Sequence, residues 1–547
     1  MMSDLHLPFW PKGLAKELTV PKTTLHSNLE ITARRYPDKA ALVFYDYVMT
    51  YRQLFDEVER MAGYLQKVCG VKKGDRVLLY LQNSPQFFVA YYAILRADAV
   101  VVPINPMNKA EELEHYVEDT GADTIFVAQD LYSHVVKLNH PQIKNIVLIC
   151  YADYLPEQTD LTIPSFVSAE KLVVSNPKVI PWTKALEENL QANPSETGPD
   201  DLCVMPYTSG TTGNPKGCMH THATVMYNTL TTAFWYLCNT QDTIYLATLP
   251  IFHVSGMQGT MNTPIYLGAT VVLMARWDRE VALKLIERYR ISRLPMIAAM
   301  VVDFMSSPNF DKYDLSSVTR ISGGGAAMPE AVAARLYDLF NIKYIEGYGM
   351  SELMAASHMN PEARPKRQCL GVPLFGVDSR IIDIDTLEEL PQGKTGEIIV
   401  HGPQMMLGYW NNPKATEETF IELDGKKFLR TGDIGYIDEE GYFFMVDRLK
   451  RMINASGYKV WPVEVESLMY KNPVIQEACV VGVQDEKRGE TVKAVVVLKP
   501  DYQDKVSEED IIAWCKEHMA AYKVPQIVEF IEELPKTASG KISWKQL

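Results

Sequence analysis

The chain has 547 residues, of which 47% are hydrophobic and 22% charged; this is enough apolar material for a large core, and the length exceeds that of one ordinary compact domain. Lys and Arg total 54 against 68 Asp and Glu, a formal net charge of −14, which excludes non-specific nucleic-acid binding and requires a local site for any bound anion. The ordinary counts of glycine (31) and proline (32) exclude a disordered or collagen-like chain.

Strands and helices alternate along the first part of the chain. Thr50 and Gln53 form a capping-box pattern ahead of an amphipathic helix, and Ser84 followed by Pro85 is typical of another helix start. The expected order is a strand at 40–45, a helix over 54–65, a strand at 76–81, a helix at 85–97, a strand at 100–104, a helix at 111–119 and a strand at 124–127. This alternation predicts parallel sheets flanked by helices.

The rest of the chain divides into a connecting region, a second alternating region and two smaller parts. Residues from about 152 to 200 have weak periodicity and scattered prolines, which predicts connecting loops. Further elements are expected as helices at 279–289, 329–340, 463–471 and 508–519 and strands at 477–483 and 491–498. We predict an α/β fold, with a large N-terminal domain of α/β sheets over 1–447, which includes a small β-rich lobe at about 370–447, and a small α+β C-terminal domain over 448–547. The tail from Asp447 is near neutral, with 15 Lys and Arg against 16 Asp and Glu.

The strongest local signal is a loop rich in glycines and hydroxyl groups. Its glycines allow backbone N–H groups to converge on an anion, and Lys216 adds a positive charge. Pro215 precedes that lysine and Gly217 follows it, so the loop is not a Walker motif. A surface turn is the alternative interpretation, but the composition suits a triphosphate. The residues concerned are Thr208, Ser209, Gly210, Thr211, Thr212, Gly213 and Lys216.

Four weaker signals follow. The glycine-rich turn at 322–327 would let a flat ring lie close to the backbone, and the run 346–352 places Tyr348 between glycines and a hydroxyl beside Glu352, which suits Mg²⁺ on phosphates. Asp433 and Arg448 are a carboxylate and a cation of the kind that bind ribose, and 539–541 presents a lysine after a glycine. Each signal alone fits an ordinary packing turn or a solvated charge equally well.

In order and spacing, these motifs resemble the AMP-forming acyl-CoA synthetase family of the adenylate-forming superfamily. Members activate a carboxylate with ATP to an acyl-adenylate, release pyrophosphate and pass the acyl group to the thiol of coenzyme A. The resemblance covers essentially the whole chain and rests on the phosphate loop at 208–217, Phe252-His253, the turn at 323–326, the run 348–352, Thr431-Gly432-Asp433, the run 447–459 and Ser539-Gly540-Lys541.

The resemblance implies ATP, Mg²⁺ and coenzyme A as cofactors and a role for each matching residue. Lys541 would bridge the carboxylate and the α-phosphate, Lys216 would hold the outer phosphates, and Glu352 with Ser351 would serve Mg²⁺. Lysine and Mg²⁺ would spread the charge that develops when two anions meet. Besides the phosphate loop, the implied nucleotide and coenzyme A set comprises Gly324, Gly325, Ala326, Glu346, Gly347, Tyr348, Gly349, Ser351, Asp433, Arg448, Lys450, Gly457, Tyr458 and Lys459.

Lys450 matches the hinge about which the family's mobile C-terminal domain rotates between the two half-reactions. In one arrangement Lys541 would point into the site; in the other, the loop around Gly457 and Tyr458 would replace it and line the pantetheine channel. Two positions depart from family patterns: Ser351 stands where threonine is common, and Asn454 stands where plant phenylpropanoid ligases and luciferases usually carry lysine.

The acid is expected to be hydrophobic. Relatives that activate amino acids place an aspartate where this chain has His253, so an amino acid is disfavoured. Methionines adapt to apolar chains of varied shape, which favours a medium- to long-chain fatty acid over acetate or malonate, although each residue taken singly also fits an ordinary core. The segments expected to line the acyl pocket contribute Trp235, Met257, Met261, Met296, Ala299, Met300, Met350 and Met354.

Alternatives remain open: an aryl or other small acid as substrate, transfer to a carrier-protein thiol, or an adenylate-binding protein without activity. The expected partners are small molecules, with no nucleic acid and no integral membrane segment, and a homodimer is left open. The eight cysteines are scattered without a zinc or CxxC pattern, and the first residues do not form a secretory signal. We therefore expect a cytoplasmic enzyme.

Overall fold

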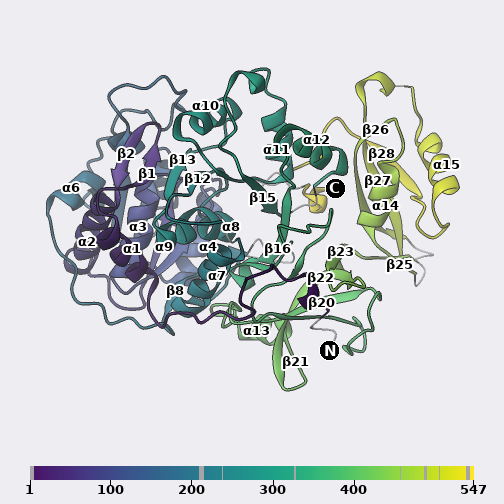
Figure 1. Cartoon of the computed structure of the whole chain (residues 1–547), viewed down its shortest axis with the longest axis horizontal. Coiled ribbons are helices and arrows are strands. Elements are labelled where there is room, and N and C mark those ends of the chain that lie inside the picture. Colours follow the sequence, from purple (N-terminus) through teal and green to yellow (C-terminus); the bar gives the residue numbers. More distant parts are fainter. Residues whose placement is uncertain are drawn as a thin grey trace. The chain divides into compact units, whose positions relative to one another are not determined.

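The structure is a computed structural model of the chain and describes residues 5–208, 215–236, 238–325, 328–455, 458–485, 489–503, 505–536 and 542–547. These residues fall into two compact units. The large unit comprises His6–Asp378 and His401–Lys427, and the small unit comprises mainly Ser379–Val400 and Phe428–Leu547. Figure 1 shows their elements in sequence colours.

The large unit is built on two mainly parallel sheets. The first has the order β11 (His220–Thr221), β8 (Leu202–Val204), β4 (Val100–Pro103), β3 (Arg76–Tyr80), β5 (Thr124–Ala128), β6 (Asn145–Ile149) and β7 (Val179–Pro181). The second has the order β18 (Val372–Pro373), β17 (Ala355–Met359), β16 (Ile345–Met350), β15 (Arg320–Gly324), β14 (Arg293–Pro295), β12 (Ile244–Ala247), β13 (Thr270–Leu273), β1 (Ala40–Phe44) and β2 (Tyr47–Thr50). Antiparallel pairing is confined to strands at or near the sheet edges, such as β11 and β2.

Helices cover these sheets, and one continuous core of buried apolar side chains joins them. The helices are α1 (Leu25–Arg35), α2 (Tyr51–Lys67), α3 (Pro85–Arg96), α4 (Ala110–Thr120), α5 (Tyr132–Leu138), α6 (Trp182–Glu187), α7 (His222–Trp235), α8 (Val254–Met257), α9 (Thr263–Leu267), α10 (Arg279–Tyr289), α11 (Ala298–Met305), α12 (Glu330–Phe340) and α13 (Pro413–Thr419). A π-helical turn, Gln258–Asn262, joins α8 to α9. Three short strands complete the unit: β9 (Tyr207–Thr208), β10 (Lys216–Gly217) and β21 (Phe420–Leu423).

The small unit has two sheets of its own. In the first, β19 (Asp378–Ile382), β20 (Gly396–His401) and β22 (Lys426–Ile437) are neighbours in that order, and β23 (Phe443–Arg448) pairs with β22. In the second, β25 (Tyr458–Val460), β24 (Ile453–Ala455), β27 (Gly489–Leu498) and β26 (Ile475–Asp485) follow one another, and β28 (Ile527–Phe530) pairs with β27. The helices α14 (Pro462–Met469) and α15 (Glu508–His518) accompany this sheet.

The predicted α/β fold is confirmed, and two helix starts show why. Thr50 and Gln53 cap α2 reciprocally, because the Thr50 hydroxyl accepts from the Gln53 N–H and the Gln53 side chain accepts from the Thr50 N–H. The Ser84 hydroxyl accepts from the Phe87 N–H at the start of α3. The connecting loops expected over 152–200 are a partial error, since β7 and α6 lie there. Both are too short for a recognisable period.

Within 370–447, β19, β20, β22 and β23 form one sheet, whereas β18 pairs with β17 in the second sheet of the large unit. By compactness, residues 401–427 group with the large unit, whereas 379–400 and 428–447 group with the small one. The predicted boundary at residue 447 separates the N-terminal domain from a C-terminal domain that is expected to rotate. This boundary stays a prediction.

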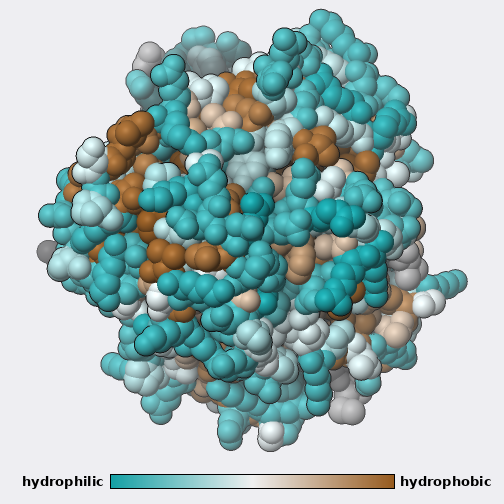
Figure 2. Space-filling view, turned by 90° about the vertical axis from the view of Figure 1, so that its left-hand side faces the viewer, coloured by the Kyte–Doolittle hydropathy of each residue, from teal (hydrophilic) through white to brown (hydrophobic). Residues whose placement is uncertain are grey.

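The surface of the large unit is mainly hydrophilic on the face shown in Figure 2, with separate apolar groups between polar side chains. Exposed apolar residues of this unit include Ile31, Val48, Val136 and Val173. Apolar side chains that are scattered in this way are normal on a folded protein. None of the described helices is both long enough and apolar enough to cross a bilayer.

Candidate active site

The glycines at the carboxyl end of β15 lie where two backbones approach closely. β15 and β16 are parallel, with Gly324 opposite Gly347, and a Cβ at Gly324 would lie 2.3 Å from the Gly347 carbonyl oxygen. A Cβ at Gly323 would lie 2.2 Å from the Met296 carbonyl oxygen. Gly325 then turns with φ +83°. Strand packing alone therefore requires these small residues, and it places Gly324 beside the Gly347-Tyr348 segment.

Two residues of the 346–352 run are held inside the large unit. The buried Glu346 carboxylate accepts from the Met328 N–H at 2.7 Å and the Cys369 N–H at 3.3 Å, and burial raises its pKa. Tyr348 is also buried, and its ring centroid lies 5.6 Å from that of His358. The Glu346 carboxylate thus holds the backbone at Met328 and at Cys369. A direct role for Glu346 in nucleotide binding stays a prediction.

The turn that carries Ser351 and Glu352 is tight, and side chains from other elements of the large unit hold it in place. A Cβ at Gly349 would lie 1.6 Å from the Ala355 carbonyl oxygen, and Met354 and Ala355 have φ of +50° and +92°. Left-handed backbone at non-glycine residues is costly, and such strain often marks functional sites. The strand β11 and the helix α7 that follows it supply the side chains that hydrogen-bond to this turn.

His220 and Asn228 hold this turn. The His220 Nε2 hydrogen-bonds the Ser351 carbonyl oxygen at 2.8 Å, and burial lowers the pKa of His220 to about 4, so this nitrogen is the donor of a neutral ring. The Asn228 amide donates to the carbonyl oxygens of Leu353 and Ala356 at 3.1 and 3.0 Å. Sequence reasoning did not single out either residue, because their role depends on contacts made across more than 100 positions.

The two ends of the phosphate loop lie on two strands, β9 and β10, that pair with each other. In the β9–β10 pair, Thr208 lies opposite Lys216. The Tyr207 hydroxyl donates to Asp119 at 2.6 Å, and His115 hydrogen-bonds the Pro215 carbonyl oxygen at 2.8 Å. Both ends of the loop are therefore anchored. The residues between them, Ser209, Gly210, Thr211, Thr212 and Gly213, and also Ala326 of the glycine-rich turn, lie outside the described residues.

Lys216, Tyr409 and Glu352 form one cluster. The Tyr409 hydroxyl donates to Glu352 Oε1 at 2.7 Å, and the Lys216 ammonium lies 5.0 Å from the centroid of the Tyr409 ring, within cation–π range. Glu352 is 6% exposed and Tyr409 8%. Burial and the Glu352 charge raise the pKa of Tyr409, so its hydroxyl keeps its proton.

Tyr409 reaches the cluster because residues 406–410 pair with residues 217–219. The Trp410 N–H donates to the Gly217 carbonyl at 2.8 Å, the Leu407 N–H donates to the Met219 carbonyl at 2.9 Å, and the Met219 N–H donates to the Gly408 carbonyl at 3.0 Å. The Met406 N–H donates to the Glu352 carbonyl at 2.9 Å. Sequence reasoning missed Tyr409. The only signal near Tyr409 in the sequence is Gly408, a position where the backbone passes too close to Thr416 to accept a larger residue.

The small unit carries the expected ribose pair. Asp433 and Arg448 are cross-strand partners on β22 and β23, and Arg448 Nε lies 3.1 Å from Asp433 Oδ1. Asp433 is buried and Arg448 is half exposed. Lys450 is exposed, and Lys459 pairs with Asp385 at 2.8 Å. Gly457 and Lys541 lie outside the described residues, as does the side chain of Tyr458.

The residues predicted for the acyl pocket lie in different environments. Met257 and Met296 are fully buried in the core of the large unit, Met300 and Met350 are half-buried, and His253 is exposed at the start of α8. Two further methionines of the predicted lining, Met261 and Met354, are also fully buried, whereas Ala299 is exposed.

Trp235 belongs to an aromatic cluster. Its ring packs edge-on against Trp10 and Phe375, with centroids 5.0 and 5.8 Å apart, and its indole N–H donates to the Asn360 carbonyl at 3.2 Å. Met296 stands next to the glycine-rich turn, since its N–H donates to the Ser322 carbonyl at 2.8 Å. The pocket role of all these residues stays a prediction.

Comparison with known proteins matches both parts of the chain to one family. The family model for the AMP-binding enzyme matches residues 29–410, and that for the AMP-binding enzyme C-terminal domain matches residues 464–541. A long-chain-fatty-acid–CoA ligase of Bacillus subtilis (strain 168) is 37% identical over 549 residues, covering 98% of this chain and 96% of the relative.

Solved structures agree with this match. An anthranilate CoA ligase in complex with anthranoyl-AMP has a TM-score of 0.80 at 27% identity and covers 97% of both chains. A fatty acyl CoA synthetase of Mycobacterium tuberculosis has a TM-score of 0.75 at 28% identity, covering 96% of this chain and 97% of that one. The chain belongs to the family of AMP-binding enzymes, and within it to the AMP-forming acid–thiol ligases, which make acyl-CoA from a carboxylic acid, ATP and coenzyme A.

Proposed function

We propose that this ligase activates a hydrophobic carboxylic acid, a medium- to long-chain fatty acid. The observation that carries the proposal is the full-length similarity to a protein named a long-chain-fatty-acid–CoA ligase. It is supported by the side chains predicted to line the acyl pocket, which are apolar except for His253 and include no arginine for a second carboxylate. The expectation of a cytoplasmic location is part of this proposal.

In the first half-reaction, a carboxylate oxygen of the acid attacks the α-phosphorus of ATP. A new P–O bond forms to the acid, the P–O bond to the β-phosphate breaks, and pyrophosphate leaves with that electron pair. Because two anions approach each other, positive charge must be fixed nearby. We assign Lys216 to the outer phosphates and Lys541 to the reacting carboxylate and α-phosphate. The Tyr409 ring supports Lys216 by restricting where its ammonium can lie.

The donor atoms at residues 351–352 fit Mg²⁺. They are oxygens only, a buried carboxylate and a hydroxyl, and Mg²⁺ bound with a nucleotide takes one or two carboxylates and fills its remaining positions with phosphate oxygens and water. Glu352 and Ser351 would hold the ion, which when bound neutralises phosphate charge. The Tyr409 hydroxyl fixes the orientation of the Glu352 carboxylate through its 2.7 Å bond. Tyr409 is therefore a positioning residue in this proposal.

In the second half-reaction, the thiol sulfur of coenzyme A attacks the acyl carbonyl. A C–S bond forms, the thiol proton is lost, and the C–O bond to the phosphate breaks so that AMP leaves. We propose that the C-terminal domain, 448–547, turns about Lys450 between the two steps. Lys541 would then leave the site, and the loop with Gly457, Tyr458 and Lys459 would line the pantetheine channel. The pairing of β24 with β25, in which Lys459 lies opposite Asn454, supports the assignment of these residues to one element.

The acyl chain is assigned to the α8–α9 segment. Its π-helical turn is a rare element that often occurs at functional sites. A Cβ built on Gly259 in that turn meets no atom within 4 Å, whereas a Cβ on Gly256 would lie 2.2 Å from the Pro250 carbonyl oxygen. Gly259 therefore faces open space, and we assign this space to the apolar chain.

A panel of acids tests the proposal. Pyrophosphate release is measured with saturated fatty acids of increasing length and with aryl acids, each with and without coenzyme A, and the thioester is identified by mass. We expect the highest kcat/KM for medium- to long-chain fatty acids. A preference for aryl acids would favour the second candidate, which is supported by the similarity to an anthranilate CoA ligase. Pyrophosphate release without thioester would indicate a carrier-protein thiol as acceptor.

A further inference from the structure

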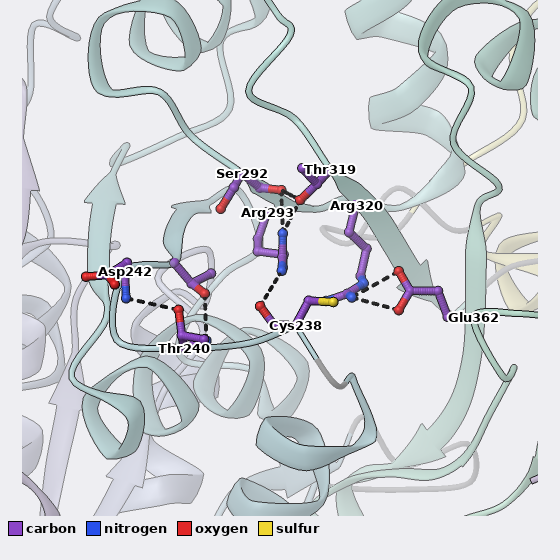
Figure 3. A pocket seen from close by; sticks show the side chains of 9 residues that line it. Cys238, Thr240, Asp242, Ser292, Arg293, Thr319, Arg320 and Glu362 are labelled. Carbon is purple, nitrogen blue, oxygen red and sulfur yellow. Dashed lines mark hydrogen bonds and ion pairs between the residues drawn. The ribbon is translucent and has the colours of Figure 1, made fainter. Parts of the chain in front are cut away.

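A cavity of about 380 Å³ lies in the large unit, away from the glycine-rich turn. Figure 3 shows Arg293 pointing toward Cys238 and Arg320 pointing toward Glu362, and all four residues line the cavity. Arg293 opens β14 and Arg320 opens β15, so the cavity lies at the amino ends of these parallel strands. Gly323 to Gly325 lie at the carboxyl end of β15, that is, at the opposite edge of the sheet. The cavity is therefore separate from the proposed nucleotide site.

Arg293 is buried and held by neutral partners only. It is 7% exposed. Its guanidinium donates to the Asn239 side-chain oxygen at 3.1 Å, to the Cys238 carbonyl at 3.0 Å and to the Ser292 carbonyl at 3.2 Å, and it also contacts the Thr319 hydroxyl. Burial and the charge of Arg320 lower its pKa. Among the described residues, no carboxylate forms an ion pair with Arg293.

Arg320 is buried and incompletely satisfied. Its side chain is 4% exposed, its Nη2 donates to both oxygens of Glu362 at 3.0 and 2.9 Å, and its guanidinium lies 4.0 Å from the centroid of the Tyr236 ring. Its Nη1 donates to the same Asn239 oxygen that Arg293 uses. Its Nε–H finds no acceptor within the part of the chain that the structure describes. A buried donor without a partner destabilises the folded chain, because it has lost its hydrogen bonds to water.

The charges around the cavity are unevenly hydrated. Two guanidinium groups are buried, and they share one neutral amide oxygen. The two carboxylates that line the cavity are hydrated: Glu362 has 46% of its side chain exposed, and Asp242 is exposed. Exposed carboxylates compensate buried cations poorly, because water screens them. The cavity thus has an excess of poorly compensated positive charge, and the buried Arg320 Nε–H beside it has no acceptor among the described residues.

We propose that this cavity binds a small phosphate-bearing anion, with Arg293 and Arg320 as its charge partners and Glu362 as an internal competitor. The planar guanidinium forks match the geometry of phosphate oxygens. A dianion would match both positive charges, whereas a monocarboxylate would leave one of them uncompensated. Binding displaces the Glu362 carboxylate from Arg320 and gives the Arg320 Nε–H an acceptor. Free phosphate, pyrophosphate and a phosphorylated metabolite share this chemistry.

Side-chain NMR of the full-length protein, labelled with ¹⁵N-arginine, tests the proposal with inorganic phosphate as the probe. Phosphate is titrated at constant ionic strength, and the Nε–Hε signals of Arg320 and Arg293 are followed. We expect both signals to shift saturably, with half-saturation below about 10 mM. Acetate at the same ionic strength should bind at least about tenfold more weakly. The absence of a saturable shift with phosphate would overturn the site, and equal binding of acetate would overturn the phosphate class.

Variants with opposite expected effects make the test sharper. Glu362→Gln removes the competing carboxylate without changing the size of the side chain, and should tighten phosphate binding several-fold, whereas Arg320→Gln should weaken it by about tenfold or more. Arg52→Gln is the matched control, because it removes a guanidinium from an exposed pair with Asp38 elsewhere in the large unit. It should change nothing.

Unchanged binding in Arg320→Gln, or weaker binding in Glu362→Gln, would contradict the assignment. The Glu362→Gln result keeps the test informative even if Arg320→Gln does not fold. Titration with pyrophosphate and with a sugar phosphate then distinguishes the sources of the phosphate group, since the one with the larger affinity gain over inorganic phosphate is the better ligand. None of these outcomes depends on whether the ligase activity proposed above is correct.

Discussion

Two clusters of charged residues, one in each unit, illustrate two different uses of burial. In the large unit, Glu352 is buried and oriented by Tyr409, and the residue assigned to chemistry is the buried one. In the small unit, Asp447 is buried and its neighbours Arg451 and Glu466 are largely buried. Of the residues assigned to function there, Asp433 is buried, whereas Arg448, Lys450 and Lys459 are exposed.

The network in the small unit explains this difference. Asp447 accepts from the Arg448 N–H and the Val463 N–H, and Glu466 accepts from the Val480 N–H and pairs with Arg451. These bonds tie β23 to α14 and β26, so the buried charges stabilise the unit. The exposed charged residues of the small unit lie outside this network and can exchange their ion-pair partners. Substitutions in the large-unit cluster should therefore affect catalysis. In the small unit, substitutions in the Asp447-Arg451-Glu466 network should affect stability, and those of the exposed charges should affect turnover.

The largest effect is expected at Lys541. Lys541→Ala removes the cation assigned to the reacting carboxylate and α-phosphate, and should lower the adenylation rate by about 10²–10³-fold. Thioester formation from supplied acyl-adenylate should be nearly unchanged, because the proposed rotation removes Lys541 from the site. Pyrophosphate release and single-turnover thioester formation measure the two steps. Equal loss of both would refute the role assigned to Lys541.

Arg451 should matter for stability instead. Arg451→Leu leaves Asp447 and Glu466 buried without their cation, and should destabilise the small unit by about 3 kcal/mol or more. Urea unfolding followed by hydrogen exchange of β26 and α14 measures this loss. Lys459→Ala, which breaks an exposed pair, is the control and should cost less than about 1 kcal/mol. Comparable losses in the two variants would remove the distinction by burial.

His220 makes the large unit sensitive to acid. Its pKa in the folded state is about 4 against 6.5 when unfolded, so between these values the unfolded state binds the extra proton. Stability is therefore complete above pH 6.5 and falls as the pH falls toward 4, by about 2 kcal/mol at pH 5. His220→Gln keeps a donor for Ser351 and should reduce the slope of unfolding free energy against pH. A variant with an unchanged slope would show that His220 does not titrate in this way.

Tyr409→Phe separates positioning from packing. The ring that lies near Lys216 is kept, and the hydrogen bond to Glu352 is lost. We expect kcat/KM for ATP to fall by about tenfold, the worth of one charge-assisted bond, with an increased requirement for Mg²⁺. Thermal unfolding should change little. A loss that Mg²⁺ does not relieve, or a large drop in Tm, would indicate packing alone.

The smallest effect concerns chain length. Gly259→Leu fills the open space in the π-helical turn, so kcat/KM should fall several-fold more for a long fatty acid than for a short one. The ratio of the two kcat/KM values measures this preference. A uniform decrease for all acids would place the acyl chain elsewhere.

Local signals predicted the fold well, and contacts between distant segments limited what could be predicted of the site. Thr50 and Gln53 identify the capping box of α2 in the sequence, and α10 begins and ends at the residues that its hydrophobic pattern predicts. β7 and α6 are too short to show a period, so they were missed. Tyr409 and His220 could not be found from sequence, because one reaches Glu352 through pairing of segments almost 200 residues apart and the other reaches Ser351 from across the unit.

An isotope experiment tests the central claim most directly. A fatty acid labelled with ¹⁸O in its carboxylate is converted with ATP and coenzyme A, and the products are analysed by mass spectrometry. If the reaction passes through an acyl-adenylate, one ¹⁸O atom of each acid appears in AMP and the other remains in the acyl-CoA. Label in inorganic phosphate together with ADP, or the absence of label from AMP, would contradict the account.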